Sequence, residues 1–530
     1  MLCPDAAARS RPIRIDRCGM GENPLYEQTY WETVSAGSPN SFPPLEEDTR
    51  ADVAVVGAGI VGLTAAYELA RAGKKVVVLE ARQLASQATA RSTAKVTSQH
   101  GLIYGRLIRN FGEDNARLYA MANQDAIEHI ATMVEKESIE CAFERKAAYV
   151  YAPDLECTSA VNDEAIAAAM LGLPARAVRE IPAPVTCTAA VCFDDQAQFN
   201  PVQYLRGLSQ TVSRMARVYE NTRVVSIDEE DEQQLVKTED GHTVTARHVV
   251  VATHLPIVPE GKYFAKAFTF SHTVAAAPLP SDIPVEGMFV SAGTPSHSFR
   301  LDTWDGTPYV IATGPSYETG VAEELARSLN DLNTFLQEHF SIDKAEFHWT
   351  NLDYRSMDEM PFAGRISSST PRLYVATGFN AWGITNGVVA ARIIADQVLQ
   401  RENAYSELFD ASRIKPLAGG TEFVKENLMS AKQMVMDYLS PKDKDASDHV
   451  PLGEARVVRE DGENIARYRD MDGCLHEVSA VCTHMGCVVE WNDVDRTWDC
   501  PCHGSRFGPD GCVLHGPATK PLEKVGTDPD

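Results

Sequence analysis

The chain has 530 residues, enough for several domains, and its 44% hydrophobic and 23% charged residues are the composition of an ordinary globular protein. Its formal net charge of −25 argues against a nucleic-acid backbone or an anionic membrane surface as partner. The apolar stretch 51–70 is about as long as a membrane span, but it contains Asp52 and Glu68, so we expect no transmembrane segment.

The first 47 residues (1–47) are expected to form an N-terminal extension with no assigned function. Residues 1–20 lack the apolar core of a secretory signal, so either a disordered tail or a natural start at Met20 would explain them. Of the twelve cysteines, six are scattered and six lie between Cys474 and Cys512. That distribution predicts a cytoplasmic protein with one metal site rather than a secreted disulfide scaffold.

The stretch 52–82 reads as a strand, a tight turn, a helix and a second strand. Gly57, Gly59 and Gly62 occupy the G-x-G-x-x-G positions, which allow the turn, the approach of a pyrophosphate and the packing of helix on strand. Glu80 ends the second strand, where its carboxylate can accept a hydrogen bond from a ribose hydroxyl. A glycine-rich turn in an ordinary βαβ unit is the alternative, but the placement of the acid favours a bound dinucleotide.

A second strand–turn–helix unit occupies residues 372–399, far downstream of the first. This layout resembles the FAD-dependent amine and amino-acid oxidoreductases of the D-amino-acid oxidase/glycine oxidase superfamily. The resemblance implies that the helix opening at Gly383, Ile384 and Thr385 directs its N-terminus at the flavin. Gly378 would make the turn before it. A helix N-terminus stabilises the negative charge of reduced flavin.

Other segments extend the resemblance over about residues 48–405. The stretch 88–101 resembles the family's loop beside the isoalloxazine ring, and Val224 falls on the strand whose backbone holds the adenine. The strand 248–254 resembles the one near the ribityl chain, although His254 replaces the usual glycine. The candidates implied for the isoalloxazine loop are Arg91, Ser92, Thr93 and Ala94.

The substrate half is expected to contain a sheet. Residues 268–279, 296–304 and 308–314 are rich in β-branched and aromatic side chains, which predicts strands. In the resembled family an arginine or tyrosine on this sheet binds the substrate carboxylate. The candidates implied here are Arg300 first, then Tyr309 and Tyr354. A surface ion pair is the alternative for the arginine. Hydride transfer to flavin needs little acid–base help, so we expect no catalytic triad.

Two short motifs near the C-terminus, CTHMGC at 482–487 and CPCHGS at 500–505, combine cysteine with histidine. Such pairs could hold zinc in a tetrahedron, but each motif carries an additional cysteine. Together the motifs resemble the Rieske [2Fe–2S] signature of the respiratory-complex type. The resemblance implies one iron bound by Cys482 and Cys500, the other by His484 and His503, and a disulfide between Cys487 and Cys502.

Residues around the motifs bear on the cluster's potential. Two histidines in place of two thiolates leave the oxidised cluster neutral, which raises the potential to about −150 to +300 mV. By resemblance, Ser505 donates a hydrogen bond to a bridging sulfide. Phe507 stands where high-potential members carry a tyrosine. We therefore expect a potential within the Rieske range but below that of the respiratory proteins.

The expected fold is an α/β FAD-binding domain, Rossmann-like and of the glutathione-reductase type, with an interleaved α+β substrate domain and a small all-β Rieske domain. Within residues 48–405, the nucleotide-binding segments are expected at 48–110, 200–258 and 350–405, and the substrate segments at 111–199 and 259–349. Residues 406–450 are expected to form a helix, around 421–439, and a polar linker. The Rieske domain is expected at 451–530.

The combined pattern predicts an FAD-dependent dehydrogenase or oxidase of a small amine or amino acid. Its electrons would pass from flavin to a Rieske cluster and on to an external acceptor, a one-electron protein or a quinone. An NAD(P)H-driven reductase that feeds a partner is one alternative, disfavoured because the chain has no second G-x-G-x-x-G. A non-catalytic redox sensor or electron-transfer protein is the other.

Overall fold

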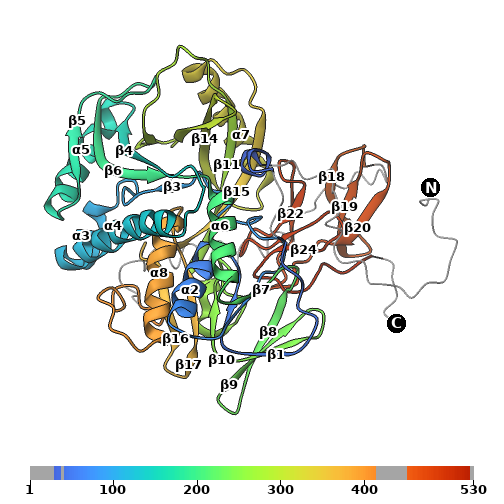
Figure 1. Ribbon diagram of the computed structural model, residues 1–530. Helices are drawn as coiled ribbons and strands as arrows, with labels where there is room; N and C mark the ends of the chain where they lie inside the picture. Colours follow the sequence, from blue (N-terminus) through green and yellow to red (C-terminus); the bar gives the residue numbers. More distant parts are fainter. Residues whose placement is uncertain (1–28, 37–40, 414–449, 526–530) are drawn as a thin grey trace.

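The computed structural model describes residues 29–36, 41–413 and 450–525 of the chain (Figure 1). The predicted N-terminal tail and the helix predicted around 421–439 lie outside these residues. Within them, no helix is both long enough and apolar enough to span a lipid bilayer.

The first layer is a sheet in the order β16-β17-β10-β1-β2-β7, parallel from β17 to β7, with the β8–β9 hairpin joined to β10. In β1, Val53 and Val55 face one hydrophobic core, and Ala54 and Val56 face another. A strand buried on both faces is what a continuous apolar run produces in a parallel sheet. The strands are β1 (Thr49–Val56), β2 (Val76–Leu79), β7 (Arg217–Tyr219), β8 (Val224–Glu230), β9 (Gln233–Thr238), β10 (Thr243–Val251), β16 (Phe362–Ser367) and β17 (Thr370–Thr377).

Helix α2 (Ile60–Arg71) packs between α6 (Pro201–Ser213) and α8 (Gly383–Val398) against this sheet. Both α2 and α8 begin directly after a strand of the sheet, β1 and β17 respectively. Their N-termini therefore lie at the carboxyl edge of the parallel strands, where open α/β sheets bind ligands.

The second layer is a mixed sheet in the order β15-β11-β14-β13-β12-β4-β6-β3, with β5 paired to β6. The three strands predicted in the substrate half are present as β11, β13 and β14. Its strands are β3 (Lys95–Val96), β4 (Glu144–Ala152), β5 (Ala175–Val178), β6 (Ala189–Gln198), β11 (Ala267–Pro278), β12 (Met288–Ser291), β13 (Ser298–Trp304), β14 (Thr307–Tyr317) and β15 (Phe347–Ser356). The remaining helical elements of these two layers are α1 (Tyr30–Val34), α3 (Tyr104–Phe111), α4 (Glu113–Lys136), α5 (Leu155–Met170), η1 (Glu260–Ala265) and α7 (Ala322–Phe340).

The C-terminal part is all β, as predicted. A three-stranded sheet β18-β19-β20 and a four-stranded sheet β21-β22-β23-β24 enclose a separate core that contains Trp498 and Phe507. The strands are β18 (Ala455–Glu460), β19 (Glu463–Arg469), β20 (Leu475–Ser479), β21 (Glu490–Asn492), β22 (Thr497–Asp499), β23 (Arg506–Phe507) and β24 (Val513–His515).

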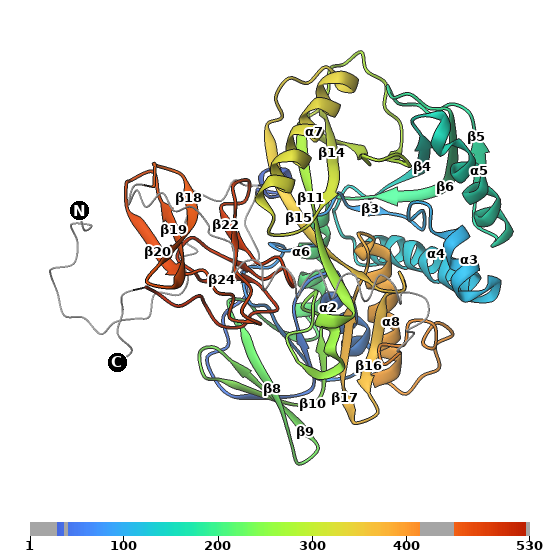
Figure 2. The same ribbon diagram turned by 180° about the vertical axis from the view of Figure 1, so that it is seen from behind.

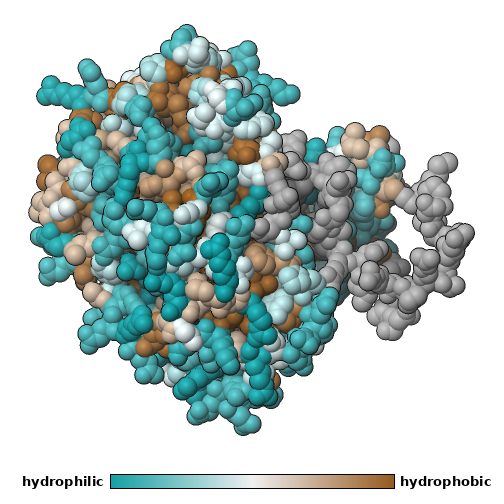
Figure 3. Space-filling model, viewed as in Figure 1, coloured by the Kyte–Doolittle hydropathy of each residue, from teal (hydrophilic) through white to brown (hydrophobic). Residues whose placement is uncertain are grey.

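This β domain, drawn in red, lies against one side of the molecule where the two larger sheets meet (Figures 1 and 2). It contacts β15 through Tyr354 and Thr350, and the first layer through Arg223, the residue before β8. Hydrophilic residues cover much of the face viewed in Figure 1, with hydrophobic residues in scattered groups (Figure 3). The fold therefore brings three parts of the chain together at one junction.

Candidate active site and metal centre

A cavity of about 310 Å³ runs between the two larger sheets, a size typical of ligand sites. One end is formed by the glycine turn and by Glu80, Arg223 and Val224. The other end is formed by side chains of the second sheet, among them His272 and Thr313. The cavity therefore extends from the predicted dinucleotide site to the predicted substrate sheet.

The glycine turn requires glycine at two of its positions. Gly57 has φ +101°, and a Cβ there would lie 2.5 Å from the carbonyl oxygen of Ala252. A Cβ at Gly62 would lie 1.9 Å from the carbonyl oxygen of Gly57, so helix and strand pack closely only with glycine there. Gly59 and Gly57 line the cavity, whereas Gly62 lies behind them.

Glu80 lines the cavity and also holds the turn. Its carboxylate accepts hydrogen bonds from the backbone N–H groups of Ala58 (2.9 Å) and Arg82 (3.0 Å). Burial raises the pKa of Glu80, and the two backbone bonds oppose that shift. The residue can thus fix the turn while it faces the ligand.

Helix α8 opens into the cavity through Gly383, Ile384 and Thr385. Its N-cap residue, Trp382, makes no side-chain capping bond, so the first backbone N–H groups of the helix are available to a ligand. Gly378 is not among the lining residues described; its φ of +76° lets the chain turn after β17.

Of the four residues predicted to lie beside the isoalloxazine ring, three line the cavity and one does not. Ser92, Thr93 and Ala94 line the cavity. Arg91 points away from it: its Nη2 is 2.5 Å from Asp495 of the C-terminal domain and its Nε donates to the carbonyl of Thr350. The prediction that Arg91 faces the ring is therefore corrected, because its guanidinium is held at the domain junction.

Three residues predicted to bind the substrate are not brought to the cavity. Arg300 is fully buried, and its guanidinium donates to the carbonyls of Thr93, Phe199 and Leu301. Its role is to hold the backbone of the lining loop from behind. The hydroxyl of Tyr309 donates to Glu346, and that of Tyr354 to the carbonyl of His503. These hydrogen bonds hold the guanidinium and the two phenol hydroxyls away from the cavity.

Lys95, which no sequence motif singled out, lies at the substrate-sheet end of the cavity. Its Nζ donates to Ser298 Oγ (2.7 Å) and Thr93 Oγ1 (3.2 Å). Burial, with a smaller contribution from nearby Arg300, lowers its pKa to about 7. The cation can therefore lose its proton near neutral pH.

Two histidines share this end of the cavity. Burial lowers the pKa of both His272 and His297, and the Nε2 of His297 lies 2.6 Å from Asp331. They come from β11 and the turn before β13, so they are adjacent only in the folded chain. The available sequence signal was weak: Lys95 lies within the predicted loop 88–101, directly after its four named candidates, and both histidines fall in predicted strands.

The four residues predicted to bind the cluster converge between two loops of the C-terminal domain. Cys482 and Cys500 are both buried, and their thiols lie close enough to interact. The imidazoles of His484 and His503 lie 4.9 Å apart between centroids and nearly perpendicular. Cys487 and Cys502 form a disulfide that joins the two loops.

The histidine nitrogens test whether this site fits a metal. The Nδ1 atoms of His484 and His503 are buried, and neither has a hydrogen-bond partner in the described part of the chain. The ring of His503 packs edge-on against that of Phe264, and an unpartnered imidazole nitrogen offers its lone pair for coordination. Two adjacent thiols and two orphaned imidazole nitrogens fit a Rieske cluster.

Ser505 and Phe507 are the two residues expected beside the cluster. Both are buried, and the Ser505 side chain lies close enough to Cys482 to interact with it. Phe507 lies on β23, within the core of the β domain. Their effects on the potential of a bound cluster remain predictions.

The cavity and the metal centre share a wall. His254 lines the cavity, its ring lies 4.6 Å from that of Tyr354, and the Tyr354 hydroxyl is 3.0 Å from the carbonyl oxygen of His503, a predicted cluster ligand. A Cβ at Gly504, where φ is +72°, would lie 2.7 Å from Leu352 Cδ1. The loop that bears the histidine therefore packs closely against β15.

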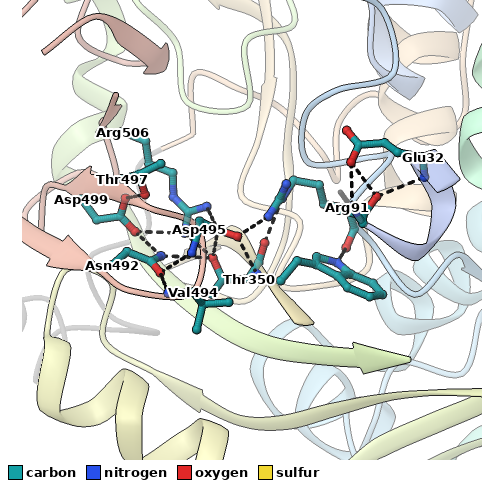
Figure 4. Close-up of polar contacts among 11 residues, drawn as sticks. Glu32, Arg91, Thr350, Asn492, Val494, Asp495, Thr497, Asp499 and Arg506 are labelled. Atoms are coloured by element: carbon teal, nitrogen blue, oxygen red, sulfur yellow. Dashed lines mark hydrogen bonds and ion pairs between the residues drawn. The ribbon is translucent and has the colours of Figure 1, made fainter. Parts of the chain in front are cut away.

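A buried ionic network joins the same two parts of the chain (Figure 4). Asp495 bridges Arg91 (2.5 Å) and Arg506 (2.8 Å), and it also accepts from the hydroxyl of Thr350. Arg506 lies 3.1 Å from Asp499. Burial acts to raise the pKa of Asp495, but the two guanidinium groups and Thr350 bring it below its usual value. The carboxylate is therefore held charged inside the junction.

Comparison with known proteins matches both halves of the chain to families. The model of the "FAD dependent oxidoreductase" family matches residues 52–397, and that of the "Rieske [2Fe-2S] domain" matches residues 442–526. The putative Rieske 2Fe-2S iron-sulfur protein YhfW of Bacillus subtilis is 37% identical over 502 residues, which are 94% of this chain and 98% of the relative.

More distant similarities cover the larger part of the chain. Gamma-glutamylputrescine oxidoreductase of Escherichia coli is 25% identical and covers 71% of this chain and 90% of the relative. The structure of glycine oxidase from Geobacillus kaustophilus aligns with a TM-score of 0.58 at 17% identity, over 69% of this chain and all (100%) of the oxidase. At that identity, the structural likeness shows the fold alone.

Proposed function

Because the chain belongs to the FAD dependent oxidoreductase family and carries a Rieske [2Fe-2S] domain, we propose that it dehydrogenates a small amine or amino acid and passes the electrons to an external acceptor. The family memberships assign FAD and a [2Fe–2S] cluster as cofactors. The proposed substrate class is supported by a relative whose name specifies an amine, gamma-glutamylputrescine oxidoreductase.

The observation that carries the electron-transfer part is the shared wall between the two sites. His254 faces the cavity, Tyr354 packs on it, and the Tyr354 hydroxyl is bonded to the backbone of the cluster ligand His503. Such contact supports direct transfer within one chain. Bound FAD would accept a hydride from substrate, and the cluster would accept electrons singly.

The chain's own residues have distinct roles in this proposal. The N-termini of α2 and α8 offer backbone N–H groups to the dinucleotide and to the flavin ring. The buried ammonium of Lys95, held by Ser298, binds the anionic end of the substrate in place of the predicted Arg300. The buried cavity walls exclude water from the reacting atoms.

Anaerobic mixing of the purified protein with a panel of amines and amino acids tests the proposal. The expected result is loss of oxidised-flavin absorbance, followed by the paramagnetic signal of the reduced cluster. Flavin bleaching without that signal would refute internal transfer. Bleaching by NADH, with no response to any amine or amino acid, would instead support the reductase alternative.

A further inference from the structure

Part of the cavity wall comes from outside the FAD dependent oxidoreductase match. That match ends at residue 397, yet the segment 514–519 of the Rieske domain lines the same cavity as the glycine turn. The lining residues of this segment are Leu514, His515, Gly516, Ala518 and Thr519. They lie at the end of β24 and in the loop that follows it.

The segment is held in place at both ends. Arg223 Nη2 donates to the carbonyl of Val513 (2.7 Å), so a residue of the first layer is hydrogen-bonded to the start of the segment. The backbone N–H of Ala518 donates to Ser505 Oγ (3.0 Å), which ties its end to a cluster-binding loop. The segment is therefore a fixed part of the wall.

Within the segment, His515 presents a buried nitrogen with no hydrogen-bond partner. Its Nδ1 lies 3.1 Å from Oε1 of Gln87, and because a carbonyl oxygen only accepts, Nδ1 carries the proton. Its Nε2 is buried and unpartnered within the described part of the chain. Burial keeps the pKa of His515 well below its usual value, so the ring is neutral. Nε2 is thus a hydrogen-bond acceptor.

The neighbours of the ring indicate which ligand would supply the missing donor. His515 contacts Gln87 and His254, and all three residues line the cavity. Gln87 precedes Thr89, whose hydroxyl accepts from the N–H of Ile60 at the start of α2, where a pyrophosphate is expected. The ring therefore lies beside the dinucleotide part of the cavity. FAD has ribose and ribityl hydroxyls to donate there.

We propose that the Rieske domain completes the FAD-binding site and that His515 accepts a hydrogen bond at Nε2 from a hydroxyl group of FAD. The Rieske domain then has a second role besides carrying the cluster. It binds the flavin cofactor directly, through a residue that the family match to the larger domain does not include.

Hydrogen exchange on the unmodified full-length protein tests the wall. Protein that keeps its cluster but has been freed of FAD is compared with the same protein after FAD is added back. We expect added FAD to slow amide exchange in peptides covering 513–519 and to leave peptides of β19, in the same domain, unchanged. Equal exchange at 513–519 with and without FAD would overturn the proposal.

A variant series tests His515 itself. His515→Asn keeps a polar atom near Nδ1 for Gln87 but has nothing at Nε2, whereas His515→Gln places its amide near Nε2. We expect the FAD dissociation constant to rise about three- to tenfold in His515→Asn, the effect of one lost hydrogen bond, with substantial recovery in His515→Gln. The constants are measured by flavin fluorescence titration.

The control is His476→Ala, which alters a histidine of the same domain that is bonded to Asp470 rather than to the cavity wall. Iron and acid-labile sulfide are measured in every variant to show that the cluster is retained. Tight FAD binding by cluster-containing His515→Asn, equal to that of the parent, would overturn the role of Nε2. If a variant loses its cluster, the exchange experiment on the parent protein decides.

Discussion

The ammonium group of Lys95 lies at the substrate-sheet end of the cavity, with its Nζ bonded to Ser298 and Thr93. Arg300 lies behind the same loop, where it donates to the carbonyl of Thr93 and adds to the effect of burial in lowering the pKa of Lys95. Arg300 thus supports the loop from behind, whereas Lys95 lies at the cavity wall, where it can contact a ligand. This division of roles leads to a test of substrate binding.

We expect Lys95→Met to lower kcat/KM for a carboxylate-bearing substrate about tenfold to a hundredfold, because one charge-assisted hydrogen bond is lost. Stopped-flow measurement of flavin reduction over a range of substrate concentrations checks this. Lys146→Met is the matched control, since Lys146 is paired with Glu144 and Glu286 outside the cavity. An unchanged kcat/KM in Lys95→Met would exclude the substrate contact.

The pH dependence of binding gives a second measurement on the same residue. Because the pKa of Lys95 is lowered to about 7, the cation is present below that pH and is lost as the pH rises through it. Substrate affinity should therefore fall above pH about 7. In Lys95→Arg it should stay level, because a guanidinium keeps its charge.

Phe507 offers a test at the cluster. A tyrosine hydroxyl at this buried position would donate a hydrogen bond to a ligand sulfur and stabilise the reduced, more negative cluster. We expect Phe507→Tyr to raise the midpoint potential on the order of 50 mV, the equivalent of about 1 kcal/mol for one electron. A redox titration that finds no rise would show that the hydroxyl cannot reach the cluster.

At the scale of elements, the structure depends on contacts between β15, the β21–β22 turn and β23. Asp495 in that turn, Thr350 on β15 and Arg506 on β23 form the network that buries Arg91 (Figure 4). A buried carboxylate between two guanidinium groups is costly to remove, because the cations stay buried.

We expect Asp495→Asn to destabilise the protein by about 3 kcal/mol and to lower its thermal midpoint by about 3 °C at a fixed scan rate. Asp493→Asn is the control in the same turn, since Asp493 is 76% exposed and its pair with Arg496 contributes little. An equal midpoint for the two variants would show that the network does not stabilise the junction.

The sign of the pH effect follows from the lowered pKa of Asp495. A carboxyl group with a depressed folded pKa contributes stability above its unfolded pKa of about 3.9, and that stability is lost as the pH falls through the folded value. The difference between parent and Asp495→Asn should therefore be constant from neutral pH down to about 5. It should shrink only in stronger acid.

Local patterns carried the sequence predictions that the structure and the comparisons confirm. The glycine turn before α2, the late unit at α8 and the all-β C-terminal part each follow from neighbouring residues in the chain. The cavity end with Lys95, His272 and His297 does not, because β3, β11 and the turn before β13 meet only through sheet pairing. The strand that carries Arg300 was predicted correctly, but the expected direction of its side chain was not found. The guanidinium is bonded to three backbone carbonyls instead, and the sequence around Arg300 does not indicate those contacts.

At the scale of the whole molecule, the position of the Rieske domain was beyond sequence reasoning. The bond from Arg91 to Asp495 spans 404 positions of sequence, and Arg91 carried a different prediction. Neither the glycine motif nor the Rieske motif indicates how the two domains pack against each other. The wall at 514–519 was missed because residues past the cluster motif match no dinucleotide pattern.

The close packing at Gly504 and the buried network have a kinetic consequence. A cluster carried on a swinging tether delivers electrons at a rate set by diffusion of its domain, and such a rate falls in viscous solvent. Such packing would hold the two sites at one separation, so the rate of the proposed flavin-to-cluster transfer should be governed by tunnelling distance. Stopped-flow traces recorded with and without glycerol should therefore give the same rate constant, and a rate that falls with viscosity would show that the junction opens.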